Sequence, residues 1–151
     1  MQNIRITIQK IVEESNRLKN KHTTETKAPV NYVCIFCQTE NEFEEFKKEA
    51  EKLGEIIKQT PTGPLFKISI NTTSGRLRLL KIRAPDETRK ERGDADFTVS
   101  NYKSFKEEYL KKERFSLVKR ENFEMIELVD PDFNVRTYFS NPPLDQQLNL
   151  I

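Results

Sequence analysis

Two aspartates separated by one residue are the carboxylates of this chain best placed to act together. Asp94 and Asp96 lie in a short strand-like run, and residues two apart in a strand face the same side. Paired carboxylates bind Mg²⁺ or Mn²⁺, or act as acid and base when their pKa values differ. A metal site with Glu127 as third carboxylate is one hypothesis. The alternative is that both aspartates pair with nearby arginines or flank a solvated edge.

The densest group of arginines immediately precedes these aspartates. A strand there places Arg76 and Arg78 on one face, and Lys81 and Arg83 on the other with Leu77 and Leu79. Charged side chains rarely share a face with leucines, so the pattern indicates either a β-bulge that turns them or a partly enclosed anion site. Guanidinium groups suit carboxylates and phosphates. The candidate ligand-binding residues are Arg78, Lys81, Arg83, Arg92, Asp94 and Asp96.

The same segment supports a second interpretation. Its arginines are interleaved with carboxylates, which would form an internal ion-pair network that holds the connection between two halves of the chain. These carboxylates are Asp86, Glu87, Glu91, Asp94 and Asp96.

The other reactive side chains do not form a catalytic motif. Cys34 and Cys37 lie inside a strand-like run, where their odd separation points them to opposite faces, so we expect buried, reduced thiols. The only histidine, His22, falls in a polar linker, which leaves no partner for a nucleophile. The glycines form neither a P-loop nor GxGxxG. No catalytic residue and no cofactor is assigned.

Composition limits the class of protein. The chain has 151 residues, 35% hydrophobic and 33% charged, which suits one globular domain with a modest core. The net charge of +2, with both signs interspersed, gives no field to attract nucleic acid. Apolar runs are too short for a membrane helix, and the N-terminus lacks a signal peptide's apolar region. We therefore expect a cytoplasmic protein with neither nucleic-acid nor membrane partners.

An internal repeat predicts the architecture. Residues 31–83 and 94–140 each show a strand, an amphipathic helix and three further strands, and Phe43 of the first aligns with Phe105 of the second. The fold class is therefore α+β, built from tandem βαβββ modules behind an N-terminal helix over residues 3–20. The expected organisation is a helix and linker (1–29), a paired domain (30–141, with modules 30–83 and 94–140) and a tail (142–151).

Local signals place the elements within each module. The first helix has two capping registers, Asn41 with Glu44 or Thr39 with Glu42, and it ends at Gly54, where we expect a positive φ. In the second module Ser100 or Asn101 caps the helix. The expected strands are 32–36, 55–59, 65–70, 76–83, 94–99, 115–119, 123–129 and 135–139.

These modules resemble the vicinal oxygen chelate superfamily, the group of glyoxalases, bleomycin-resistance proteins and extradiol dioxygenases. The matching motifs are Phe97-Thr98-Val99 before the second helix and the Asp130-Pro131-Asp132-Phe133-Asn134 turn before the last strand. The resemblance implies a cup-shaped sheet around a small-molecule site. Metal-dependent members carry His or Glu at positions that fall on Asp94 and near Thr137, Tyr32 and Leu79 here, so the resemblance implies a fold without the usual metal ligands.

The leading hypothesis is a metal-independent protein that binds a small anionic ligand in the cup. One alternative is a divalent-metal-dependent, lyase- or isomerase-like enzyme that uses Asp94 and Asp96. Another is a dimeric assembly protein without a small-molecule site. Its homodimer would form through the N-terminal helix or through the apolar C-terminal tail (142–151).

Overall fold

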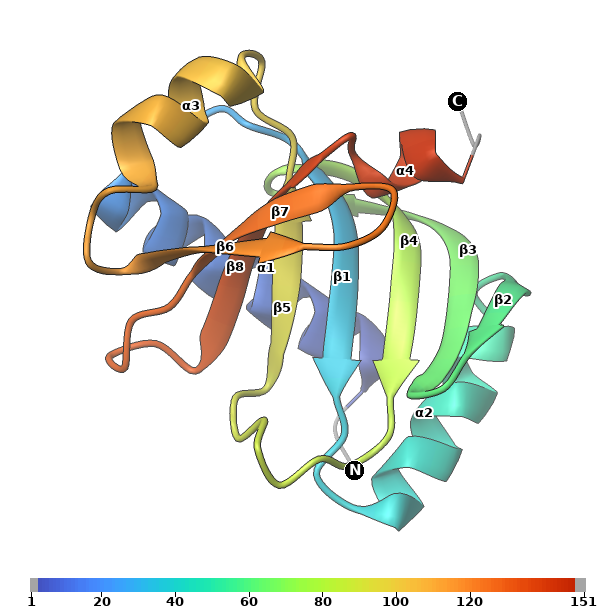
Figure 1. The fold of residues 1–151 in the computed structure, drawn as a ribbon. Helices are drawn as coiled ribbons and strands as arrows, with labels where there is room; N and C mark the ends of the chain where they lie inside the picture. The colour runs from blue at the N-terminus through green and yellow to red at the C-terminus, as the bar shows by residue number, and fades with distance from the viewer. Residues whose placement is uncertain (1–2, 149–151) are drawn as a thin grey trace.

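The computed structural model describes residues 3–148, which form helices around one eight-stranded mixed sheet (Figure 1). The elements in chain order are α1 (Ile4–His22), β1 (Val30–Phe36), α2 (Glu40–Glu51), β2 (Glu55–Thr60), β3 (Gly63–Thr72), β4 (Gly75–Arg83), β5 (Gly93–Phe97), α3 (Tyr102–Tyr109), β6 (Phe115–Lys119), β7 (Glu124–Leu128), β8 (Val135–Asn141) and α4 (Leu144–Gln147).

The sheet confirms the predicted α+β class and the tandem βαβββ order. Its strands lie in the order β2-β3-β4-β1-β5-β8-β7-β6, so the first strand of each module lies at the centre. Within each module the first and last strands pair in parallel, β1 with β4 and β5 with β8. The modules join through the antiparallel pair β1–β5. The first and last strands of the two modules, β4, β1, β5 and β8, are therefore adjacent in the sheet.

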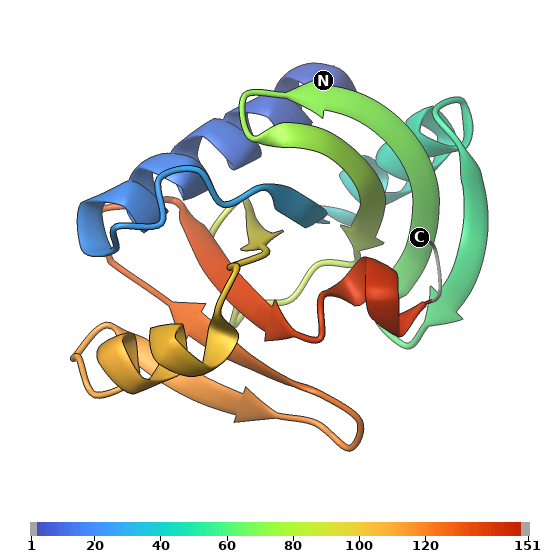
Figure 2. The ribbon, with the colours of Figure 1, turned by 90° about the horizontal axis from the view of Figure 1, so that it is seen from above.

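Helix α1 covers the middle of the sheet on its convex side. Its apolar stripe, which includes Ile8, Ile11 and Leu18, is fully buried, and the helix packs against β1, β5 and β8 (Figure 2). Asn3 caps its first turn by accepting hydrogen bonds from two backbone amides. The helix therefore caps the domain. No helix within residues 3–148 is both long and apolar enough to span a membrane.

Strand β4 departs from the expected alternation. Leu80 and Ile82 belong to the core under the helices, so Lys81 and Arg83 point to the opposite, concave face. Leu77 also belongs to that core, and the pairing of β3 with β4 shifts register on this part of the strand. The prediction that Leu77 shares the face of the two cations is therefore wrong; the extra residue of this bulge lies on β3, where Lys67 and Ile70 pair with Leu79 and Leu77.

The ends of α2 show one correct and one incorrect local prediction. Thr39 is the N-cap and accepts a hydrogen bond from the Glu42 amide at 3.0 Å, which confirms the second of the two capping registers. Gly54 does not have the positive φ that was expected of it. A Cβ there would lie 1.8 Å from the carbonyl oxygen of Lys67 on β3. Close approach of two backbones, not a left-handed conformation, requires glycine at this position.

Any side chain at position 54 should therefore lower the unfolding free energy, whether or not the new residue tolerates a left-handed backbone conformation. We expect Gly54→Ala and Gly54→Asn to lower the unfolding free energy alike, by about 1–3 kcal/mol, in urea titrations. Asparagine tolerates left-handed backbone, so a positive φ would make it the milder substitution. Gly75→Ala is the contrasting case, because a Cβ there meets only Pro29, at 3.8 Å, while the φ of +103° strains any residue with a side chain. A clearly milder Gly54→Asn would contradict the close-approach explanation.

Candidate functional site

A cavity of about 240 Å³ lies on the concave face, where the four central strands meet. The β6–β7 hairpin crosses in front of these strands, and α4 lies at one end of the same face (Figure 1). Because each strand contributes alternate residues, the lining side chains come in pairs from β1, β4, β5 and β8. These pairs are Tyr32 and Cys34, Lys81 and Arg83, Asp94 and Asp96, and Tyr138 and Ser140.

Four of the six predicted ligand-binding residues line this cavity: Lys81, Arg83, Asp94 and Asp96. Arg92 does not. Its guanidinium donates to both carboxylate oxygens of Glu42 on α2, at 2.7 and 3.0 Å, and lies against the ring of Phe46 in the convex-side core. Arg92 precedes β5 and turns toward the helix that starts after β1, so it ties the modules together and lies outside the cup.

Arg78 is also separate from this cavity, although it lies on the same strand as Lys81. It lines a second recess beside Asn31 and Thr98, nearer the start of β4.

Asp94 is the most unusual group of the cavity. It is buried, and its Oδ1 accepts no hydrogen bond from the residues that the structure describes. Burial raises the pKa of this carboxyl to about 7, and the neighbouring Asp96 adds to the rise, while Arg89 and Arg83 oppose it. Near neutral pH Asp94 therefore exists in both protonation states. An unpartnered buried oxygen is a site where a ligand would gain a strong hydrogen bond.

Asp96, in contrast, is held by neighbours. Its Oδ1 accepts from the Ser140 amide at 3.1 Å and from Asn31 Nδ2 at 3.3 Å, and the Ser140 hydroxyl donates to its Oδ2. Burial raises its pKa to about 6, and the hydrogen bonds from Ser140 and Asn31 limit that rise. Asp96 is thus held in place by hydrogen bonds within the protein. Asp94 is the carboxyl of the pair with an oxygen that is available to a ligand.

Cationic side chains surround Asp94. Burial lowers the pKa of Lys81, whose ammonium forms no ion pair within residues 3–148. Arg83 pairs with Asp86 at 3.2 Å, but its buried Nε has no hydrogen-bond partner among the described residues. Arg89 contacts Tyr138 and lies over the Phe36 ring. Four cations and two carboxyls line the cavity, so its charge balance is positive and favours an anion.

The outer wall of the cavity comes from segments that sequence reasoning did not assign to the site. Arg120 and Phe123 flank the turn of the β6–β7 hairpin, Met125 follows on β7, and Leu144 begins α4. Phe123, Met125 and Leu144 give the cavity an apolar part, and Arg120 adds a further cation. No local sequence pattern identifies these residues as part of a site. The hairpin residues reach it because the curvature of the sheet brings the hairpin over the central strands (Figure 2).

Tyr138 was also missed, although one signal was available. The resemblance placed a ligand near Thr137, but the hydroxyl of Thr137 donates to the Ser15 carbonyl of α1, on the convex side. The next residue therefore faces the cup, and it pairs with Asp96 across β5 and β8. Tyr138 donates a hydrogen bond to Glu127, and burial raises the pKa of this phenol.

The predicted ion-pair network exists in part. Arg136 joins Glu91 of the connector, at 3.0 Å, to Glu127 of β7, at 3.3 Å. Together with the Arg83–Asp86 pair, it holds the connector against the sheet. Asp94 and Asp96, which that interpretation included, form no ion pair within residues 3–148. The network therefore positions the cavity wall and leaves the aspartates inside it.

The positions of the family's metal ligands do not fit a metal here. Tyr32 is a buried phenol whose pKa is raised well above its ordinary value by burial, Leu79 is apolar, and Thr137 faces α1. Within residues 3–148, no group of three or more His, Cys, Asp or Glu side chains could hold a metal. Asp94, Asp96 and Glu127 accordingly do not form one cluster, and Glu127 is engaged by Arg136 and Tyr138.

The two cysteines behave as predicted. Both are buried free thiols; Cys34 lines the cavity, and Cys37 belongs to the core under the helices, so they point to opposite faces. Burial raises the pKa of both thiols, that of Cys37 to about 12. Neither is a nucleophile at neutral pH.

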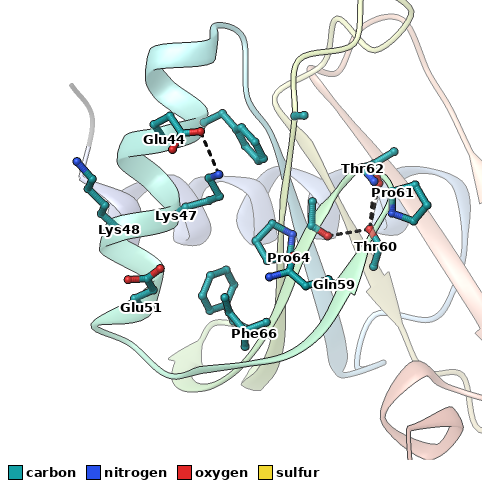
Figure 3. Close-up of a pocket in the computed structure, with 14 residues that line it drawn as sticks. Glu44, Lys47, Lys48, Glu51, Gln59, Thr60, Pro61, Thr62, Pro64 and Phe66 are labelled. Atoms are coloured by element: carbon teal, nitrogen blue, oxygen red, sulfur yellow. Dashed lines mark hydrogen bonds and ion pairs between the residues drawn. The ribbon is translucent and has the colours of Figure 1, made fainter.

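A larger, open groove of about 560 Å³ lies between α2 and the β2–β3 hairpin (Figure 3). Some of its polar side chains already pair with one another. Lys47 pairs with Glu44 at 3.0 Å and lies over the Phe43 ring, and the Thr60 hydroxyl donates to the Gly63 carbonyl at 2.7 Å. Unlike the cup, the groove contains no buried polar atom without a partner among the described residues.

Comparison with known proteins supports the fold and adds nothing about chemistry. No protein-family model matches the sequence, and no curated protein matches it. The solved structure of Structural Genomics protein EC4020 is similar, with a TM-score of 0.64 and 14% identity, over 93% of this chain and 91% of that chain. A glyoxalase/bleomycin resistance protein/dioxygenase superfamily member from Vibrio splendidus 12B01 matches with a TM-score of 0.46 and 11% identity, over 75% and 97% of the two chains. The likeness to EC4020 shows that the two chains share a fold over nearly their whole lengths.

Proposed function

We propose that this protein binds a small anionic molecule in the cup, without a metal ion. The observation that carries the proposal is the buried, unpartnered oxygen of Asp94 among Lys81, Arg83 and Arg89. A carboxylate or phosphate placed there would receive hydrogen bonds from the cations and from the protonated form of Asp94. The apolar wall at Phe123 and Leu144 would cover the rest of the molecule.

The charges around Asp94 favour this proposal over the metal-dependent enzyme. A divalent cation at Asp94 would lie close to Arg83 and Arg89, both of which act on this carboxyl electrostatically. Like charges at such distances cost several kcal/mol in a partly desolvated site, an order of magnitude set by Coulomb's law. The same cations stabilise an anion. We therefore treat Asp94 as a hydrogen-bonding partner of a ligand and not as a metal ligand.

Thermal-shift and calorimetric titrations with acetate, glycolate, octanoate and inorganic phosphate test the proposal. We expect at least one of these anions to raise the melting temperature, because a ligand that binds only the folded state stabilises it. Arg83→Gln and Lys81→Met should weaken that binding roughly tenfold or more, the loss expected for one charge-assisted hydrogen bond. Arg114→Gln, at an exposed arginine outside the cup, is the matched control.

A flat response to all four anions would contradict the proposal. So would an Arg83→Gln variant that binds like the wild type. Stabilisation by Mg²⁺ or Mn²⁺ that disappears in Asp94→Asn would instead support the metal-dependent alternative.

A further inference from the structure

A second recess of about 390 Å³ lies on the concave side, between α4 and the N-terminal ends of β1 and β4. Its polar lining comes from four parts of the chain that are far apart in sequence. These residues are Asn31, Arg76, Arg78, Thr98, Asp145 and Gln146. Apart from Arg78, the recess contains none of the residues predicted to bind a ligand.

Asn31 gives this recess an unmet hydrogen-bonding requirement. Its side chain is only 7% exposed, and its Nδ2 donates to Thr98 Oγ1 at 2.9 Å and to Asp96 Oδ1 at 3.3 Å. These two bonds fix the orientation of the amide, and its buried Oδ1 accepts no hydrogen bond within the described chain. A ligand that donates a hydrogen bond would remove that deficit.

Arg78 gives the recess a free cation. Its guanidinium forms no hydrogen bond or ion pair within residues 3–148, in contrast to Arg83, Arg92 and Arg136. Arg76 donates to Ser69 across β3 and β4. Asp145 of α4 opposes these charges, so the recess keeps a single excess positive charge. One anionic group would neutralise it.

The two recesses are neighbours along the same strands. Asn31 of the second recess is hydrogen-bonded to Asp96 of the first. Pro143 and Leu144, adjacent at the start of α4, line one recess each. Arg78 and Arg83 are five residues apart on β4, roughly 17 Å at the rise of a strand, so a ligand of eight to ten carbons reaches both charged groups only if the two long side chains lean toward each other.

We propose that the two recesses hold the two ends of one elongated ligand with an anionic group at each end. One end binds at Lys81 and Arg83. The other end carries an anionic group that pairs with Arg78 and a neighbouring hydroxyl or amino group that donates a hydrogen bond to Asn31; the dicarboxylate probes below test the contact with Arg78 alone. This proposal rests on the proposed function, because it extends the same cup toward α4.

Titration with two series of linear probes tests the proposal. The first series is octanoate and decanoate, which carry one carboxylate. The second is suberate and sebacate, which have the same chain lengths and a carboxylate at each end. We expect the wild-type protein to bind the better dicarboxylate roughly tenfold or more tightly than its monocarboxylate, since the second contact becomes intramolecular. Arg78→Gln should remove this preference and keep monocarboxylate binding, whereas Arg83→Gln should weaken both.

Controls separate the failure of this inference from the failure of the proposed function. Arg114→Gln should retain the wild-type preference. If octanoate binds in the cup but suberate and sebacate bind no better than their monocarboxylates, the two-ended ligand is wrong and the anion site stands. A preference that survives in Arg78→Gln also overturns the inference. If none of the four linear probes binds but acetate, glycolate or phosphate does, the two-ended ligand is wrong and the anion site stands; if no anion of either set binds, both proposals fail.

Discussion

Replacement of Asp94 by asparagine should make the protein more stable at pH 8 and remove most of its pH dependence between pH 6 and pH 8. The folded-state pKa of about 7 exceeds the ordinary value of 3.8, mainly because of burial. The folded state therefore binds more protons than the unfolded state across this interval, and the unfolding free energy falls as pH rises. A pKa rise of this size lowers the unfolding free energy by about 4 kcal/mol in total as the pH rises from below the ordinary pKa to above the folded-state pKa. About 1 kcal/mol of this loss falls between pH 6 and pH 8.

Urea titrations at a series of pH values measure this effect. Asp96, with a pKa of about 6, contributes at lower pH, and the carboxyls of Glu42 and Asp86, whose pKa values are lowered, act below the interval. The control is Asp132→Asn, because Asp132 is an exposed carboxylate for which the wild-type slope should persist. An Asp94→Asn variant with an unchanged slope between pH 6 and pH 8 would show that Asp94 is already ionised in the folded protein.

The same titration bears on the proposed anion site. Below pH 7 the protonated Asp94 carboxyl can donate a hydrogen bond to a bound carboxylate or phosphate, whereas above it the ionised form repels an anion. Anion affinity should therefore fall as the pH rises through about 7, the pKa of Asp94. This dependence would be absent from a ligand held by the arginines alone.

Truncation of α1 side chains should distinguish the face that packs on the sheet from the face that does not. Ile8 is fully buried and Ile6 is 51% exposed, two residues away on the same helix. Ile8→Ala should lower the unfolding free energy by about 2–5 kcal/mol through lost burial and the cavity left behind. Ile6→Ala should change it by less than about 0.5 kcal/mol, as is usual at the surface. Urea denaturation of the two variants provides the measurement.

This pair of variants also tests the alternative of an assembly protein. If α1 forms a dimer through its outer face, Ile6→Ala should change the oligomeric state measured by sedimentation. Equal stability losses for the two variants would contradict the packing of α1 on the sheet. A wild-type sedimentation profile for Ile6→Ala removes support for dimerisation through this face of the helix.

Much of the fold was predictable because it depends on interactions between residues that are close together in the sequence. The βαβββ order follows from apolar periodicity and from turns such as Asp130–Asn134, both of which depend on neighbouring residues. Thr39 caps α2 for the same reason, because a cap acts within its own turn. Gly54 shows the limit of local reasoning: its position at a helix end was recognised, but its reason is the approach of β3, thirteen residues later at Lys67.

By itself, the sequence determined the class of fold, the two modules and the segment that carries the charged groups of the cup. Only the tertiary structure decided which of these groups share a cavity. Arg92 turned to Glu42, Arg78 moved to a second recess, and Tyr138 took the place expected near Thr137. The physical reason is that register shifts and sheet curvature set the direction of each side chain, and both depend on strands far apart in the chain.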